Sequence, residues 1–183
     1  VVLFIIAVMG GRVIPMFTNN GIPGTQATRH PLVEKLALGS VLLLLAADVL
    51  PAPAAVITVI ALVAALAHAT RLALWQPWRT LKTPLVWVLH AAYAWIVIYL
   101  VLRALAALGL VAETLALHAL TIGAIGGMTI GMMTRTARGH TGRPLLADRY
   151  EIAAFALVLC AALIRVFGAM IVPDAYLSTL IGS

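Results

Sequence analysis

The sequence predicts an all-α polytopic membrane protein, a single bundle of transmembrane helices. Of its 183 residues, 63% are hydrophobic and 10% are charged, whereas a soluble globular domain carries about 25% charged residues. The apolar residues form runs of about 20, which is the length that a helix needs to cross a bilayer. No run alternates polar and apolar residues as the strands of a membrane barrel do.

Five apolar runs are long enough to be complete spans, and the first run of the chain is shorter. We expect complete spans at residues 32–50, 54–74, 85–108, 113–134 and 150–172, and a partial span at about 1–17. Pro51 and Pro53 separate the first two complete spans, Pro84 begins the third, and Gly109 follows it, as these residues do at helix ends. We expect one domain, residues 1–183, that is part of a longer protein.

The charges predict the orientation of the bundle. If the spans alternate, loops 18–31, 75–84 and 135–149 share one side, and ten of the twelve basic residues lie there or at the adjoining helix ends. The positive-inside rule makes this side cytoplasmic. The other side carries two cations and three acids: Arg103, Arg165, Asp48, Glu113 and Asp174. The net charge of +6 therefore indicates contact with the lipid bilayer and no nucleic acid partner.

Three histidines lie inside the apolar runs, at positions 68, 90 and 118. An ionisable residue within a span is a candidate functional residue, and imidazole binds haem iron, copper and zinc. His68 and His90 should lie roughly 8–9 Å below the cytoplasmic surface at 1.5 Å per residue, and could face one another. His118 lies near the opposite side, which predicts two levels. Alternatively, each histidine only bonds a nearby carbonyl, and His68 follows Arg71, whose side chain can reach the interface.

Span 113–134 has two predicted faces. Gly123, Gly127 and Gly131 are spaced by four residues, so a neighbouring helix can approach them closely. The opposite face carries polar and thioether side chains, which we expect to line a buried cavity: Thr114, His118, Thr121, Met128, Thr129 and Met132. Alternatively, the threonines bond their own backbone and the methionines are packing residues.

Other polar residues near the cytoplasmic side are weaker candidates. Trp87, His90 and Tyr93 share one helix face, where Tyr93 could donate to a ligand or orient His90. Arg138, His140 and Arg143 could bind anions such as haem propionates, or contact lipid phosphates. His30 lies before a proline and gives no separate signal, and Cys160 is expected to be a core residue.

Four segments resemble the NnrS family. Residues 11–18 read GRVIPMFT, 89–95 read LHAAYAW, 117–126 read LHALTIGAIG, and MTR at 133–135 is followed by GHTGRP at 139–144. They are similar, in order, to the family's GRxIPFFT, LHxxYAW, LHALxxGAIG and MTR…GHTGRP segments. Met16 stands where we expect Phe, and Gly127 where a bulkier polar residue is usual.

The resemblance implies a haem- and copper-containing protein of the bacterial inner membrane, linked to the response to or protection from nitric oxide (nitrosative stress). NnrS proteins are about twice this length, so the chain would be part of the second half, with the missing half as its partner. The resemblance makes His90, His118 and His140 candidate ligands or ligand supports, with Arg12, Tyr93 and Arg143 at cofactor-binding positions. His68 lies outside the matched segments and is a candidate metal ligand by its position in a span.

Two other functions remain open at this point. A transporter or channel could use His118, Thr121 and Arg103 along a proton or anion path, although no proline interrupts spans 85–108 and 113–134, as broken transporter helices would suggest. A non-catalytic membrane anchor would leave the histidines unexplained. No carboxylate pair or thiolate indicates a reaction, so the sequence leaves open whether the protein is an enzyme.

Overall fold

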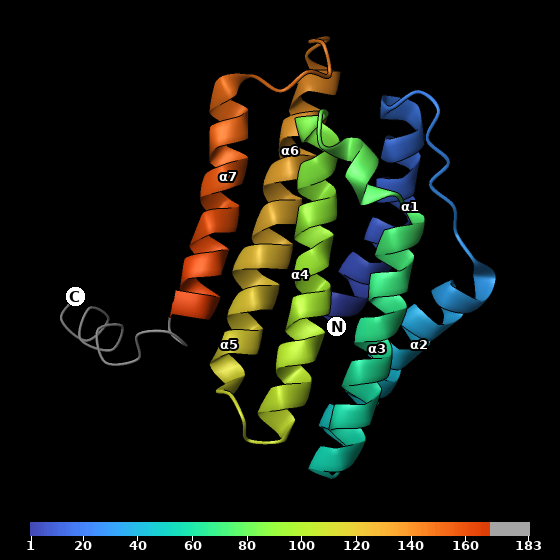
Figure 1. The fold of residues 1–183 in the computed structure, drawn as a ribbon, viewed down its shortest axis with the longest axis vertical. Coiled ribbons are helices and arrows are strands. Elements are labelled where there is room, and N and C mark those ends of the chain that lie inside the picture. The colour runs from blue at the N-terminus through green and yellow to red at the C-terminus, as the bar shows by residue number, and fades with distance from the viewer. Residues whose placement is uncertain (169–183) are drawn as a thin grey trace, which may run out of the picture.

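The computed structural model describes residues 1–168, and all the regular structure in this part of the chain is helical (Figure 1). The elements are α1 (Val2–Gly21), α2 (Pro31–Val49), α3 (Ala54–Leu74), a 3-10 turn (Pro77–Thr80), α4 (Pro84–Ala107), α5 (Glu113–His118), a π-helical segment (Ala119–Gly126), α6 (Gly127–His140), α7 (Arg149–Leu163) and a second π-helical segment (Ile164–Gly168). The segments from α5 to α6 form one continuous helix, and α7 continues into the last segment. The predicted all-α helical bundle is confirmed.

Five helices are long and apolar enough to span a membrane: Val2–Gly21, Ala54–Leu74, Pro84–Ala107, Glu113–His140 and Arg149–Gly168. Five complete spans were predicted and five helices qualify, but α1 is among the five and α2, predicted as a complete span, is not. α1 has 20 residues rather than a partial span. α2 has 19 residues and contains Glu34, Lys35 and Asp48, so its charge density is too high for a simple span. Residues 169–172 of the predicted last span, and Asp174, lie outside the described residues.

Two of the three predicted basic loops and the start of the third group at one end of the bundle, and the rest of the third descends along its side to α2 (Figure 1). The end of α1, residues 75–83 and residues 141–148 lie together at the top of Figure 1, and turns 50–53 and 108–112 lie at the bottom. Arg79 donates to the Gly24 carbonyl at 2.6 Å, and the Arg135 guanidinium lies 3.8 Å from the centre of the Phe17 ring. We call this the basic end, because it holds the basic loops predicted to be cytoplasmic.

α4 is the central helix and packs against α1, α3, the Glu113–His140 helix and α7. The glycine face of the Glu113–His140 helix meets it as predicted. A Cβ at Gly127 would lie 2.8 Å from the Ala92 Cβ, and one at Gly131 would lie 2.8 Å from Leu89. The Trp95 ring occupies the equivalent space at Gly123. Because each glycine lacks a side chain, the two backbones approach closely.

The middle of this helix differs from the prediction. The sequence predicts an uninterrupted helix because it contains no proline, whereas residues Ala119–Gly126 form a π-helix. A π-helical stretch is rare and is often found at functional sites. Trp95 lies against Gly123, near the centre of this stretch, so the wider turn occurs where a bulky ring packs on a bare backbone.

Candidate functional site

Three buried polar side chains meet between α3 and α4 near the basic end. His68 and Arg71 lie one turn apart on α3, and Tyr93 faces them from α4. All three are at most 1% exposed. The Tyr93 hydroxyl lies 2.7 Å from His68 Nδ1 and 2.8 Å from Arg71 Nη1. Polar groups at such a depth require partners within the protein, and these three are each other's partners.

The neighbouring groups fix the direction of each hydrogen bond. A guanidinium can only donate, so Arg71 donates to the Tyr93 oxygen and Tyr93 donates its own proton to His68 Nδ1. His68 Nε2 then carries a hydrogen and donates to the Ala37 carbonyl, 3.2 Å away on α2. Both ring nitrogens of His68 are therefore occupied in this arrangement.

The sequence allows the Arg71 side chain to extend to the membrane–water interface, but in the structure it stays inside the bundle. Its guanidinium forms a bidentate ion pair with the Glu34 carboxylate on α2. Its Nη1 also donates to the Ala7 carbonyl on α1 at 2.8 Å. Gly11 makes this approach possible, since any Cβ there would overlap the guanidinium. The buried carboxylate partner explains the difference, because a paired guanidinium need not extend to water.

His90 occupies a neighbouring but separate position. Its Nδ1 lies 3.1 Å from the Val86 carbonyl and its Nε2 lies 3.3 Å from the Thr18 hydroxyl on α1. The backbone of Trp75 is a further hydrogen-bonding group beside the ring. Tyr93 was predicted as a possible orienting group for His90, but the structure directs its hydroxyl to His68 instead. The helix backbone at Val86 takes the orienting role.

The partners of His90 leave one ring nitrogen poorly satisfied. Thr18 donates its only hydroxyl proton to the Ile14 carbonyl at 2.8 Å, so it can offer His90 no second proton. If His90 donates from Nδ1 to Val86, its Nε2 lone pair faces an oxygen without an available hydrogen. A neutral imidazole has one donor and one acceptor nitrogen. In this tautomer Nε2 is the ring nitrogen of His90 that can bind another group.

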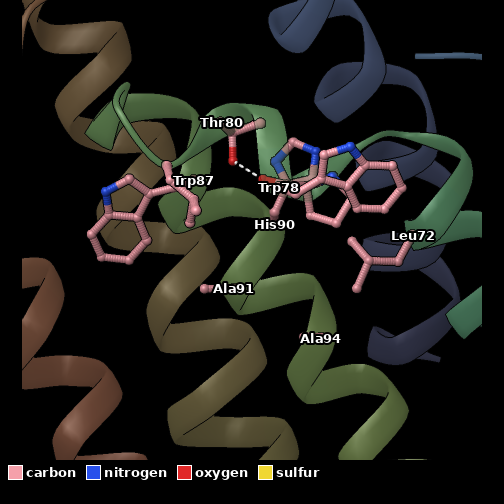
Figure 2. Close-up of a pocket in the computed structure, with 9 residues that line it drawn as sticks. Leu72, Trp78, Thr80, Trp87, His90, Ala91 and Ala94 are labelled. Atoms are coloured by element: carbon pink, nitrogen blue, oxygen red, sulfur yellow. Dashed lines mark hydrogen bonds between the residues drawn. The ribbon is translucent and has the colours of Figure 1, made fainter.

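A pocket of about 260 Å³ lies beside His90 (Figure 2). Its wall includes Trp78 and Thr80 from the loop at the basic end, and Ala91 and Ala94 along α4. Close by, the Trp75 ring meets His90 edge-on, with centroids 6.5 Å apart. The buried Trp75 Nε1 has no hydrogen-bond acceptor among the described residues. An unpaired buried N–H costs about 1–3 kcal/mol, so this donor beside His90 is an unusual feature.

His118 lies near the other end of the bundle, as the predicted two levels require (Figure 1). Its Nε2 accepts a hydrogen bond from Arg165 Nε at 3.3 Å. His90 is six residues inside one end of α4 and His118 five residues inside the opposite end of its helix. At 1.5 Å per residue His90 lies about 9 Å and His118 about 7.5 Å from its own helix end. The two rings therefore cannot share one ligand atom.

The polar stripe predicted to line a cavity faces outward instead. Thr114, Thr121 and Thr129 are exposed, and Thr121 bonds its own helix at the Leu117 carbonyl, 2.8 Å away. The glycine face takes the inner position, so the opposite face must point away from the bundle. Met128 and Met132 line a small apolar groove against α1. Arg103 is paired with Asp48 and Glu113 at the bundle end.

Comparison with known protein families agrees with the resemblance of the four segments. The family model described as NnrS protein matches residues 1–183, the whole chain. The chain belongs to the NnrS family. It is a membrane protein of the nitric oxide response in general terms. Searches among curated proteins and among solved structures give no match.

The remaining candidate residues of this NnrS chain lie apart from the buried network. His140 lines a surface groove at the basic end with Phe17 and Arg135. Arg143 lines a second groove there. Arg12 is exposed on α1, and His30 caps the start of α2 at the surface. Cys160 is exposed rather than buried in the core, because its face of α7 has no neighbouring helix in the described bundle.

The described residues can be compared with what a metal site needs. No three His, Cys, Asp or Glu side chains within residues 1–168 are close enough to hold one ion. The pocket beside His90 is smaller than the range of about 300–1,000 Å³ typical of small-molecule sites. The groups near the pocket that suit a metal-bound cofactor are one candidate ligand atom, Nε2 of His90, and the buried indole N–H of Trp75 as a hydrogen-bond donor. The proposed metal role of His68 stays a prediction, and it would require breaking a bond to Tyr93 or Ala37.

Glu34 and Thr18 are the site residues that sequence reasoning missed. Glu34 is an acid in an otherwise apolar run that also contains Lys35. Because intramembrane charges usually occur in pairs, Arg71 in the next span was a signal for such a partner. Thr18 ends the GRVIPMFT segment, but nothing in the sequence places it beside His90.

Proposed function

We propose that this NnrS chain is part of a haem- and copper-binding protein of the bacterial inner membrane that acts in the response to, or protection from, nitric oxide. The observation that supports this is His90. Its Nδ1 lies 3.1 Å from the Val86 carbonyl and its Nε2 lies 3.3 Å from the Thr18 hydroxyl oxygen, with the Trp75 backbone also beside the ring. Histidines that bind metals typically donate their other ring N–H to such a backbone carbonyl.

In this proposal His90 supplies one ligand through Nε2, and the unpaired indole N–H of Trp75 is a donor near the His90 ring. Residues outside the described bundle, in the missing half of a longer NnrS protein, would supply the other ligands and most of the cofactor pocket. Haem iron would supply the binding of nitric oxide. Because nitric oxide is small and apolar, it can reach the site through the bilayer.

His118 belongs to a second level of the same proposal. It lies at the opposite end of the bundle from His90, where Arg165 is its partner. We assign the two histidines to different metals, or one of them to a supporting role, rather than to the two faces of one haem. His140 and Arg143 remain proposed cofactor-binding residues, with the basic side chains directed at anionic groups such as haem propionates. The cofactor-binding role that the resemblance implies for Arg12 stays a prediction.

The experiment is an optical spectrum and a metal analysis of the full-length protein purified in detergent. We expect a Soret band and bound copper in the wild-type protein. His90→Ala and His118→Ala should each lower haem or copper content, and His30→Ala, an exposed matched control, should not. Loss of the same haem in both variants would make the histidines ligands of one centre. Retention of both metals in both variants would remove His90 and His118 from the site.

A further inference from the structure

The outer face of α1 carries a regular stripe of exposed side chains. Val2, Ile5, Met9, Arg12 and Met16 follow one another at spacings of three and four residues, and all are exposed. The four apolar members keep between 48% and 55% of their surface exposed. Spacings of this kind form a seam along which a second helix packs. α1 lies behind α3 and α4 in Figure 1 and packs on α2 and α4 with its other faces.

Arg12 is an uncompensated cation within this stripe. It makes no hydrogen bond or ion pair with any other described residue, although the same part of the chain holds five carboxylates. Each carboxylate is already engaged: Glu34 with Arg71, Asp48 and Glu113 with Arg103, and Asp148 and Glu151 with Arg138. Among residues 1–168, therefore, no carboxylate is left unpaired for Arg12.

The depth of Arg12 makes exposure to lipid unfavourable. It lies nine residues before Gly21, the end of α1 at the basic end, which corresponds to about 13 Å along the helix. Helical side chains lean toward the N-terminus of their helix, and α1 ends at the basic end (Figure 1). The guanidinium is thus directed away from the nearer headgroups. Arginine at such depth normally faces protein or a water-filled cavity.

We propose that the outer face of α1 docks a transmembrane helix from outside these 183 residues, and that this helix carries a carboxylate at the level of Arg12. Charge complementarity identifies the occupant. A second copy using the same face would bring two Arg12 side chains together about a two-fold axis, and its described carboxylates are already paired. Lipid offers anions only at the headgroups. This surface is separate from the His90 pocket, and the pairing replaces the cofactor-binding role that the resemblance implies for Arg12.

The test measures oxygen accessibility of spin labels on the stripe. In a Cys160→Ser background, Met9→Cys and Met16→Cys are labelled, with Leu157→Cys on the exposed face of α7 as a reference. The chain is studied in native membranes and, purified, in phosphatidylcholine vesicles. We expect both stripe labels to be protected in native membranes and as accessible as the reference in vesicles. Full accessibility in native membranes would show that lipid covers the face. Protection in vesicles would show a second copy. Either result overturns the proposal.

Charge variants test the carboxylate. Arg12→Glu places an acid against the proposed acid, so the protection of Met9→Cys in native membranes should be lost, whereas Arg12→Lys should keep it. An unchanged Leu157→Cys signal in the Arg12→Glu variant checks that the bundle remains folded. If Arg12→Glu keeps the protection, the partner helix has no carboxylate at this level and the proposal is wrong.

Discussion

The Tyr93 hydroxyl donates to His68 Nδ1 across 2.7 Å and joins α4 to α3 inside the bundle. The Arg71 guanidinium, 2.8 Å from the same oxygen, fixes the direction of that bond because it can only donate. One hydroxyl thus satisfies two buried side chains. Through Ala37 and Glu34 the network continues to α2, and through Ala7 to α1. Four helices therefore depend on one set of polar contacts.

Tyr93→Phe should destabilise the protein. The change leaves His68 Nδ1 without a donor and removes one acceptor of Arg71, at a cost of about 1–3 kcal/mol for the unsatisfied groups. Thermal unfolding in detergent measures the effect. Tyr150→Phe is the matched control, because Tyr150 is 70% exposed and its hydroxyl only accepts from Arg149. Equal unfolding temperatures for the two variants would show that the Tyr93 hydroxyl bond contributes nothing measurable.

Glu34→Gln should destabilise more strongly, because it leaves the Arg71 charge inside the bundle without a counter-ion. Breaking a buried ion pair typically costs about 3–5 kcal/mol, and the 22% exposure of the Glu34 side chain places this pair at the lower end. Glu113→Gln is the control, since Glu113 is 62% exposed and 3.5 Å from Arg103, where a pair contributes about 0–1 kcal/mol. Chemical unfolding of the two variants should separate them. Similar losses would mean that water screens the Glu34 pair.

Much of the fold could be predicted because it depends on patterns that are visible within the sequence of a single helix or loop. Runs of apolar residues locate the spans, the asymmetry of basic residues groups the loops, and the spacing of Gly123, Gly127 and Gly131 identifies the face that meets α4. Each property is independent of how neighbouring helices are rotated. α2 was less predictable, because its three charges are compatible with a span only when one of them has a buried partner.

The site was less predictable because hydrogen-bond partners depend on helix rotation. His90 and Tyr93 share a face by spacing, which suggested that Tyr93 orients His90. In the bundle Tyr93 turns to α3 and His90 turns to Thr18 on α1. The same limit explains the threonines of the Glu113–His140 helix. Their common face was evident, but the inward position of the glycine face decides that the threonines point outward.

Gly127→Leu should destabilise the bundle by forcing its helix away from α4. A Cβ at this position would lie 2.8 Å from the Ala92 Cβ, and overpacking typically costs about 1–3 kcal/mol. Gly139→Leu on the same helix is the control, because a Cβ there meets nothing within 4 Å. Thermal unfolding in detergent should show a loss for position 127 alone. A wild-type transition for Gly127→Leu would show that the helices can separate at little cost.

The first turn of α7 should loosen in acid through Asp148. Hydrogen bonds from the Glu151 and Tyr150 amides, together with Arg138, hold the pKa of the Asp148 carboxyl below its ordinary value of 3.8. A lowered pKa gives stability that is complete above the ordinary value and is lost as the pH falls through the lower folded value. Amide hydrogen exchange in this turn should therefore rise in that acid range. Asp148→Asn keeps an acceptor that does not titrate, so an identical acid response in that variant would exclude Asp148 as the cause.

The basic end should face the cytoplasm. Residues 75–83 and 141–148 lie together there (Figure 1), and the three loops predicted on this side carry seven of the twelve basic residues. The positive-inside rule places such a side in the cytoplasm. In a Cys160→Ser background, His140→Cys offers an exposed thiol at this end, and Leu110→Cys offers one in the opposite turn, where Leu110 is 67% exposed. A membrane-impermeant maleimide added to intact spheroplasts should label position 110 at once and position 140 only after permeabilisation. The reverse pattern would invert the orientation, and would place the His90 pocket on the periplasmic side.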